Sequence, residues 1–192
     1  MKNLLLSLLC ISVLFYSACK PSREKSVAQI QGLEKRLFSP ETVSFDKVKA
    51  DSLMNLYAAF IKSHPKDTLT PVYLFKSASL AMNSGDGGKA LLLFDQYLND
   101  YPDLKKAPLC MFFKAFIYEN MLRNLEKAKE TYLLFIERYP NHEFVRDARM
   151  AIRNLGKTPE QIVSEFEAQR KADSIRKADS LALAKKIKPK KK

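Results

Sequence analysis

The chain has 192 residues, 46% of them hydrophobic and 28% charged, which is enough apolar material for one core. Only five glycines occur, so tight turns are few and an all-helical protein is favoured, and no stretch after residue 19 is long and apolar enough to span a bilayer. The net charge of +12 lies mostly in residues 170–192, where ten Lys or Arg stand beside two acidic residues, so the rest of the chain is nearly balanced.

Residues 1–18 have the character of a secretory signal. Lys2 precedes an apolar run from Leu4 to Phe15, and we expect the segment to be removed from the mature chain. Two small residues stand directly before Cys19. This ending resembles the lipobox of bacterial lipoproteins, which implies cleavage before Cys19 and acylation of that cysteine, for example with palmitate. The alternative is an ordinary signal that happens to end near a cysteine.

The segment after the expected cleavage site is short and polar. We interpret residues 19–25 as a tether between the lipid and a helical domain that spans residues 26–168. With the signal removed and Cys19 acylated, Cys110 remains as a single thiol, so no intramolecular disulfide is expected. Because neither His nor Lys flanks Cys110, a small buried side chain is favoured over a reactive thiol.

A helical spacing of apolar residues appears three times. A first residue is followed by an aromatic residue four positions later and by another three positions after that, and a proline then ends the helix. The first members are 37 and 38 residues apart, a period typical of stacked helical hairpins. The three sets are Leu53, Tyr57, Phe60 and Pro65; Ala90, Phe94, Tyr97 and Pro102; and Ala128, Tyr132, Phe135 and Pro140.

Two of these hairpins resemble tetratricopeptide repeats. Each has an alanine in both helices, Ala78 with Ala90 and Ala115 with Ala128, and each ends on Tyr-Pro. The resemblance is best for residues 71–102 and 108–140 and weaker for residues 26–65. It implies an all-α fold of stacked antiparallel helical hairpins, a TPR-like solenoid, in which small residues let paired helices approach closely.

A further helix is expected to cover the open end of this solenoid. Thr158 and Gln161 can form a capping box around a proline that suits the first helical position. We expect this C-terminal capping helix to bury Ile162, Val163 and Phe166, because a solenoid needs a terminal cap to be soluble.

The basic tail, residues 169–192, is predicted to be partly helical and partly disordered. Three roles stay open for it: a solubilising end, a contact with anionic lipid, or a contact with the cell-wall polymer. Each lysine near an anionic membrane contributes about 1 kcal/mol, so the tail could supplement a lipid anchor. Nucleic acid is not expected as the partner of an exported protein.

Catalysis finds little support in the sequence. The two histidines, His64 and His142, lie near helix-ending prolines, and no second ligand stands at metal spacing from either. The glycines of residues 85–88 precede a lysine but lack the order of a phosphate-binding loop, so we expect a turn between helices there. We therefore expect no catalytic residues, no metal site and no cofactor.

Recognition is the remaining function, and the resemblance to tetratricopeptide repeats implies its place. In that family the first helix of each hairpin lines the inner surface. Aromatic side chains with a polar edge suit an extended or helical peptide, although the same aromatic residues could instead pack against neighbouring hairpins. The candidate partner-binding residues are Phe75, Ser79 and Asn83 in one hairpin and Phe112, Phe116, Glu119 and Asn120 in the next.

Together these features predict a lipid-anchored adaptor of the cell envelope that binds a protein or peptide partner. The layout of signal, cysteine, tether and hairpins resembles the lipoproteins of outer-membrane β-barrel assembly. That resemblance implies the periplasmic face of the outer membrane of a Gram-negative bacterium. Two alternatives stay open: a structural protein that links membrane to cell wall through its basic tail, and a regulatory subunit of an envelope enzyme.

Overall fold

The computed structural model describes residues 22–39 and 45–187. Within these ranges every regular element is an α-helix. The expected signal sequence, Cys19 and the last residues of the tail, 188–192, lie outside the described residues. The helices are α2 (Arg23–Leu37), α3 (Lys47–Ser63), α4 (Thr70–Asn83), α5 (Gly87–Asp100), α6 (Ala107–Asn120), α7 (Leu125–Arg138), α8 (Val145–Asn154) and α9 (Pro159–Ile187).

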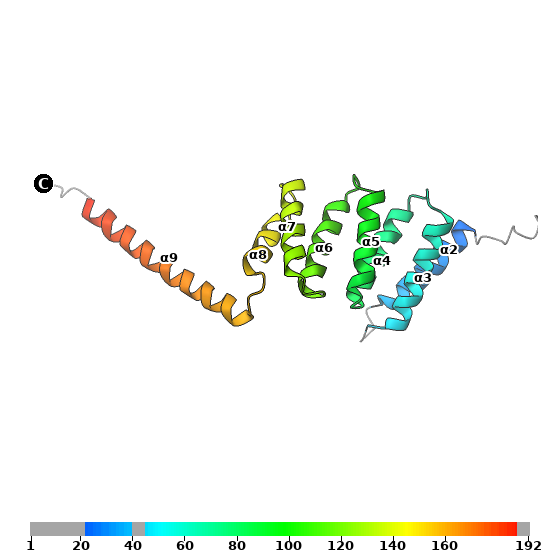
Figure 1. The fold of residues 1–192 in the computed structure, drawn as a ribbon, viewed down its shortest axis with the longest axis horizontal. Coiled ribbons are helices and arrows are strands. Elements are labelled where there is room, and N and C mark those ends of the chain that lie inside the picture. Colours follow the sequence, from blue (N-terminus) through cyan, green and yellow to red (C-terminus); the bar gives the residue numbers. More distant parts are fainter. Residues whose placement is uncertain (1–21, 40–44, 188–192) are drawn as a thin grey trace, which may run out of the picture.

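The helices form a row of hairpins (Figure 1). From α2 to α8, each helix packs mainly against the next one in the chain. The pairs α2 with α3, α4 with α5, and α6 with α7 are the three hairpins, and α8 follows at the end of the row. The predicted TPR-like solenoid is therefore confirmed.

The residues of the recurring sequence pattern form the core of the row. All nine helical members of the three sets are at most 2% exposed. Ala78 and Ala115 are fully buried, as close approach of paired helices requires. The buried residues fall into two clusters that meet at α6, where Cys110 and Ile117 belong to the first cluster and Met111 to the second.

Two of the predicted local signals act as expected at helix ends. Gly85 adopts a φ of +83° in the expected turn, which is shorter than predicted because Gly87 and Gly88 already belong to α5. The Asp86 side chain accepts a hydrogen bond from a backbone N–H of α5 at 2.9 Å. At the start of α9 the capping box forms in both directions. Thr158 N donates to Gln161 Oε1 at 2.9 Å, and Gln161 N donates to Thr158 Oγ1 at 3.3 Å.

The helix α9 does not cap the solenoid. It leaves the row beyond α8 and projects away from it (Figure 1). Val163 is 56% exposed and Phe166 62% exposed, whereas Ile162 is half-buried. The prediction that this helix buries the three side chains against the last repeat is wrong.

Arg153 gives a physical reason for this difference. It stands in α8, 38 residues after Ala115, at the place where the two preceding hairpins carry a buried alanine. A long charged side chain at that place prevents a paired helix from approaching closely. The cap is therefore α8 itself, which buries Ala148 against the second cluster and keeps Arg146 and Arg149 exposed.

The ends of the described chain differ in detail from the expected segments. The helix α2 begins at Arg23, inside the segment 19–25 that was expected to be a tether. The helix α9 continues without a break to Ile187, across the position expected for the start of the tail. None of the helices in the described ranges has both the length and the hydropathy that crossing a bilayer requires.

Candidate partner-binding site

One face of α4 carries the first set of candidate residues. Phe75, Ser79 and Asn83 are spaced four residues apart, so they lie on the same face of the helix. They line a cavity of about 290 Å³, which we call the α4 pocket. Its other lining residues come from α2 and the end that follows it, from α3 and from α4: Glu34, Phe38, Tyr57, Lys76 and Leu80.

Three aromatic side chains, Phe38, Tyr57 and Phe75, are among the eight residues that line the α4 pocket. The ring centroid of Phe75 lies 6.1 Å from those of Phe94 and Tyr97 in α5, and Phe75 itself is half-buried. Phe38, directly after α2, is 62% exposed. Phe75 therefore both packs against the next helix and lines the pocket, so the two alternatives for it are compatible.

A hydrogen-bond network joins the three helices around the α4 pocket. Glu34 Oε1 accepts hydrogen bonds from Tyr57 OH at 2.6 Å and from Lys76 Nζ at 2.8 Å. Burial, and then the hydrogen bond to Glu34, raises the pKa of Tyr57, so the phenol stays protonated and donates. The network fixes one wall of the pocket because it ties α2, α3 and α4 together.

Two polar side chains on the α4 pocket are suited to hold a ligand. Ser79 Oγ is buried and has no hydrogen-bond partner among the described residues. Such a group costs about 1–3 kcal/mol when it is left unpaired, so a ligand that bonds to it gains that amount. Asn83 is exposed at the end of α4 and offers both a donor and an acceptor.

The aromatic candidates on α6 divide between packing and exposure. The Phe112 ring stacks on Phe144, ahead of α8, with the centroids 4.9 Å apart, and it meets the ring of Phe135 at 5.6 Å. This side chain belongs to the contact between the third hairpin and the cap. Phe116, one turn further along α6, is 40% exposed and remains accessible.

The polar candidates on α6 bond within the third hairpin. Glu119 Oε2 accepts a hydrogen bond from Tyr132 OH at 2.9 Å, and Asn120 Nδ2 donates to the carbonyl oxygen of Phe116 at 3.1 Å. None of the four α6 candidates lines the α4 pocket. The structure thus brings Phe75, Ser79 and Asn83 into one site and leaves the α6 set outside it.

Five residues of the α4 pocket were not among the predicted site residues: Glu34, Phe38, Tyr57, Lys76 and Leu80. Glu34 and Lys76 are 42 residues apart, so no short-range pattern links them. One signal in the sequence could have indicated Glu34. Tyr57 and Tyr132 occupy equivalent places in the second helices of the first and third hairpins, and each donates a hydrogen bond to a glutamate of the preceding helix.

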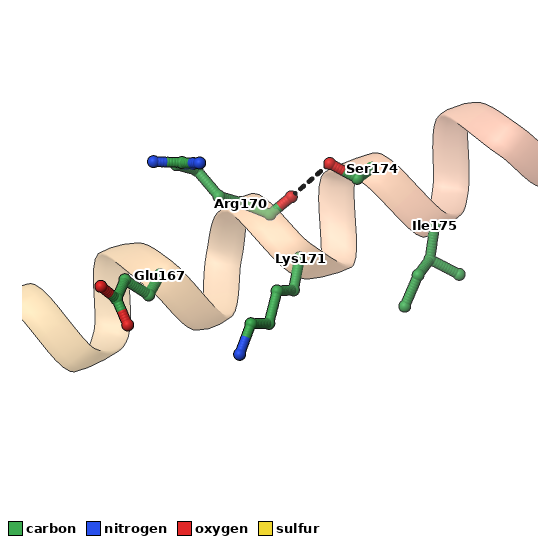
Figure 2. A pocket seen from close by; sticks show the side chains of 5 residues that line it. All are labelled: Glu167, Arg170, Lys171, Ser174 and Ile175. Atoms are coloured by element: carbon green, nitrogen blue, oxygen red, sulfur yellow. Dashed lines mark hydrogen bonds between the residues drawn. The ribbon is translucent and has the colours of Figure 1, made fainter.

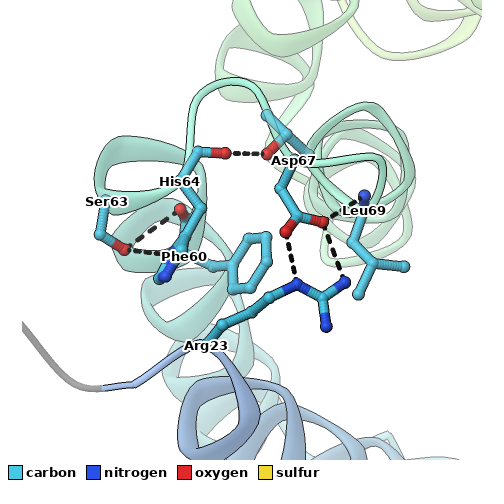
Figure 3. A network of polar contacts seen from close by, with 7 residues as sticks. Arg23, Phe60, Ser63, His64, Asp67 and Leu69 are labelled. Atoms are coloured by element: carbon cyan, nitrogen blue, oxygen red, sulfur yellow. Dashed lines mark hydrogen bonds and ion pairs between the residues drawn. The ribbon is translucent and has the colours of Figure 1, made fainter.

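The polar contacts between α2 and the turn after α3 have a structural role (Figure 3). Asp67 accepts hydrogen bonds from Arg23 Nη2 at 3.2 Å and from Leu69 N at 2.9 Å. The hydrogen bond from Arg23, followed by that from Leu69, holds the pKa of Asp67 below its ordinary value. His64 lies in the same turn with its Nδ1 2.8 Å from Ser63 Oγ. These contacts fasten α2 to the first turn.

The hollow shown in Figure 2 lies along α9 alone. Its five lining residues, from Glu167 to Ile175, all belong to this helix. Ser174 Oγ donates to the carbonyl oxygen of Arg170 at 2.9 Å, a bond within the same helix. Because no second element faces the hollow, it cannot enclose a ligand.

Reactive and metal-binding side chains are dispersed through the described part of the chain. No group of three His, Cys, Asp or Glu residues in that part is arranged to hold a metal ion. Cys110 is fully buried, and burial raises the pKa of its thiol to about 12. The prediction of a packing role for Cys110 is confirmed.

Comparison with known proteins identifies one part of the fold. Residues 111–142 match the tetratricopeptide repeat family, and they cover most of α6, all of α7 and the turn that follows. No curated protein matches the chain. The matched segment is the hairpin that packs on the cap, with Ala115 and Ala128 buried between its helices. The chain therefore contains a tetratricopeptide repeat within an all-helical solenoid, a fold that typically serves protein–protein interaction and not catalysis.

Proposed function

We propose that this protein is a lipid-anchored adaptor of the cell envelope that holds a protein partner through the α4 pocket. The observation that carries the proposal is the construction of that pocket. Three of its eight lining residues are aromatic, the hydrogen bonds to Glu34 fix one of its walls, and Ser79 Oγ is buried there without a partner among the described residues.

The size and chemistry of the α4 pocket favour a segment of a protein over a free cofactor. Its volume of about 290 Å³ is at the lower end of small-molecule sites, so it suits a single large apolar side chain. Ser79 and Asn83 can bond to the backbone on either side of that side chain. Phe116 stands 37 residues after Ser79, at the equivalent place of the next hairpin, so a longer segment could continue towards it.

The membrane anchor in this proposal is an acyl group on Cys19. Only two residues lie between Cys19 and Ser22, whose side chain caps α2. Even fully extended, this connection spans roughly 10 Å, so the solenoid would begin close to the lipid surface. The proposed location is the periplasmic face of the outer membrane of a Gram-negative bacterium, where the protein would act in outer-membrane protein assembly.

Metabolic labelling with palmitate tests the anchor. We expect label on the wild-type chain and none on Cys19→Ala, because the lipobox resemblance assigns acylation to that thiol. A matched Cys110→Ala variant should keep full labelling, since that thiol is buried. Equal labelling of the wild type and Cys19→Ala would overturn the lipid anchor and leave the pocket proposal intact.

Site-specific photo-crosslinking in cells tests the pocket. A photoreactive residue at Asn83, on the α4 pocket, should form one stoichiometric adduct with a protein partner. The same residue at Leu92, which is 73% exposed on α5, is the matched control and should not form it. Phe38→Ser, which alters an exposed wall residue, should reduce the adduct severalfold. An adduct that forms equally at both positions, or that ignores Phe38→Ser, contradicts the proposal.

The projecting helix α9 favours a second candidate function, a link to the cell wall. Because α9 leaves the solenoid, it carries the basic end of the chain away from the α4 pocket (Figure 1). Deletion of residues 170–192 should then abolish sedimentation with purified cell wall. If sedimentation is unchanged by the deletion, the tail does not provide such a link.

A further inference from the structure

The last helix of the row, α8, exposes a stripe of long side chains. Arg146, Met150 and Arg153 are spaced four and three residues apart, so they lie on one face of the helix. All three are exposed, and neither arginine joins an ion pair between described residues. We call this set the α8 stripe. It is apolar at its centre and positively charged at both ends.

The first turns of α9 carry a stripe of opposite charge. Glu160, Val163 and Glu167 are spaced three and four residues apart, so they also share one helix face. Val163 is 56% exposed, and neither glutamate joins an ion pair between described residues. We call this set the α9 stripe. It has the same length as the α8 stripe, an apolar centre and negatively charged ends.

The two stripes do not face each other within one chain. Ile162, Glu165 and Gln169 of α9 line a hollow of about 820 Å³ that α8 lines from its other side, so this side of α9 is turned towards its own α8. Each member of the α9 stripe stands two residues before one of these three, and two residues turn an α-helix by about 200°. The α9 stripe therefore points away from the α8 stripe of the same molecule.

We propose that a second copy of this chain packs its α9 stripe on the α8 stripe, and that the contact is reciprocal. With the two helices antiparallel, Val163 of one copy lies on Met150 of the other. Glu160 and Arg153 are each three residues from these central residues, so their charges meet at one end.

The same register also matches the other end of the stripes. Glu167 and Arg146 are each four residues from the central residues, so they meet as well. A two-fold axis repeats the contact, because an isologous dimer uses the same pair of surfaces twice. The dimer then contains two ion pairs in each contact, arranged around an apolar centre.

The complementarity of the two stripes favours a second copy over an unrelated partner. An acidic helix from another protein would cover the α8 stripe but would leave the α9 stripe unpaired, whereas a second copy covers both. Packing would also support α9 itself. This helix leaves the row with Val163 and Phe166 exposed (Figure 1), although helices in proteins owe most of their stability to packing of an apolar face.

Sedimentation velocity of the purified chain tests the proposal. The sample is residues 19–192, which include every described helix, with Cys19→Ala so that no acyl group is attached. We expect an equilibrium between monomer and dimer that shifts towards the dimer as the concentration rises. The dissociation constant should rise severalfold between about 50 and 500 mM NaCl, because salt screens exposed ion pairs.

Two charge-reversed variants separate the contributions of the stripes. Arg146→Glu/Arg153→Glu reverses the α8 stripe, and Glu160→Arg/Glu167→Arg reverses the α9 stripe. Each variant alone places like charges opposite each other in both contacts, so its dimer should be at least about tenfold weaker than that of the wild type. All four positions are exposed, so the fold should be kept, which far-UV circular dichroism checks.

Mixing the two variants tests the reciprocal contact directly. A pair of unlike variants has the wild-type charges in one contact and the reversed charges in the other, so both contacts again join opposite charges. We expect a one-to-one mixture to dimerise with a dissociation constant within about threefold of the wild-type value. Phe38→Ser, in the α4 pocket, should leave the dimer unchanged, so this proposal and the proposed function can fail separately.

A disulfide between the copies measures the register. Met150→Cys in the variant with the reversed α8 stripe and Val163→Cys in the other variant should link the two chains under mild oxidation, because the antiparallel register places these residues opposite each other. Leu133→Cys, at a position that is also 50% exposed but lies on α7, is the matched control for Met150→Cys and should not link.

Any of three results overturns the proposal. The first is a chain that stays monomeric at all concentrations, which would assign the α8 stripe to an acidic segment of another protein. The second is a mixture that dimerises no better than the separate variants. The third is a disulfide that forms equally well with Leu133→Cys.

Discussion

The hydrogen bond between Tyr132 and Glu119 makes a quantitative prediction about the third hairpin. Tyr132 is 1% exposed, and its OH donates to Glu119 Oε2 at 2.9 Å. The equivalent residues of the second hairpin are Phe94 and Met82, which are both apolar. The two hairpins therefore use two alternative pairs at the same place, one polar and one apolar.

Breaking only one partner of the polar pair should be costly. Tyr132→Phe removes a hydrogen bond to a carboxylate, which we expect to lower the free energy of unfolding by about 2 kcal/mol. For a chain of this length, that loss corresponds to a fall in Tm of about 4–8 °C. Glu119→Met leaves the buried Tyr132 OH without its acceptor and should cost about 1–3 kcal/mol.

The double variant Tyr132→Phe/Glu119→Met should recover most of this loss. It reproduces the pair that the second hairpin already contains, and replacing both partners with apolar groups of similar shape is nearly neutral. We expect its stability within about 1 kcal/mol of the wild type, so the coupling energy is about 2 kcal/mol or more. Additive losses in the double variant would refute the equivalence of the two pairs.

Urea unfolding followed by far-UV circular dichroism measures these differences, provided that the slope with denaturant stays constant. Tyr57→Phe in the first hairpin is the matched control. It removes the equivalent hydrogen bond to Glu34, but that carboxylate keeps Lys76 as a partner. Its cost should therefore be smaller than that of Tyr132→Phe.

Three further predictions concern single side chains. Burial raises the pKa of the Cys110 thiol from 9.0 to about 12. At pH 8 a thiol reagent should therefore modify Cys110 about a thousandfold more slowly in the folded chain than in the unfolded chain. Peptide mass spectrometry measures the two rates. The pKa of Asp67 is lowered from 3.8, so its ion pair with Arg23 stabilises the fold at pH values above 3.8. The difference in unfolding free energy between the wild type and Arg23→Ala should therefore shrink as the pH falls below about 4. A difference that stays constant with pH contradicts this account. Phe166→Ser should change the urea midpoint little, because Phe166 is 62% exposed. Phe135→Ser should lower the free energy of unfolding by about 3–5 kcal/mol, because Phe135 is fully buried. Similar losses of stability in the two variants would contradict the exposed position of α9.

Short-range patterns were sufficient to predict most of the fold. The spacing of Leu53, Tyr57 and Phe60 occurs three times and follows the helical period, and a proline comes after each set. The helices that carry it can therefore be recognised from the sequence alone. Every helical residue of that pattern is in the core. The two members of the capping box also needed only local information, because both lie within one helical turn.

The α4 pocket was only half predictable. Phe75, Ser79 and Asn83 share one helix face, which the period of the helix fixes. Their opposite wall comes from α2, and its position depends on tertiary contacts such as that between Glu34 and Lys76, which no local rule encodes. The resemblance to the repeat family did not indicate that Phe112 packs on Phe144, because Phe144 lies outside the hairpin that carries Phe112.

The prediction for α9 was wrong because it depended on the start signal of that helix alone and did not include the residues of α8, the helix that precedes it. Phe166 matches the aromatic position of the recurring pattern, but Gln169 stands where the preceding hairpin has Phe135. Arg153 likewise replaces the alanine that a paired helix needs. Comparing these positions across the repeats would have indicated that the regular pairing ends at α8.

The division of the core into two clusters has a consequence for how the solenoid opens. Each helix packs mainly on its chain neighbours, so the first cluster, from α2 to α6, and the second, from α6 to α8, share only a narrow boundary. In such a linear array, one end can exchange its amide protons while the other stays closed. A partner bound in the α4 pocket would slow exchange in α2 to α5 and leave α7 and α8 nearly unaffected. The order of exchange along the chain would then report which cluster a partner holds.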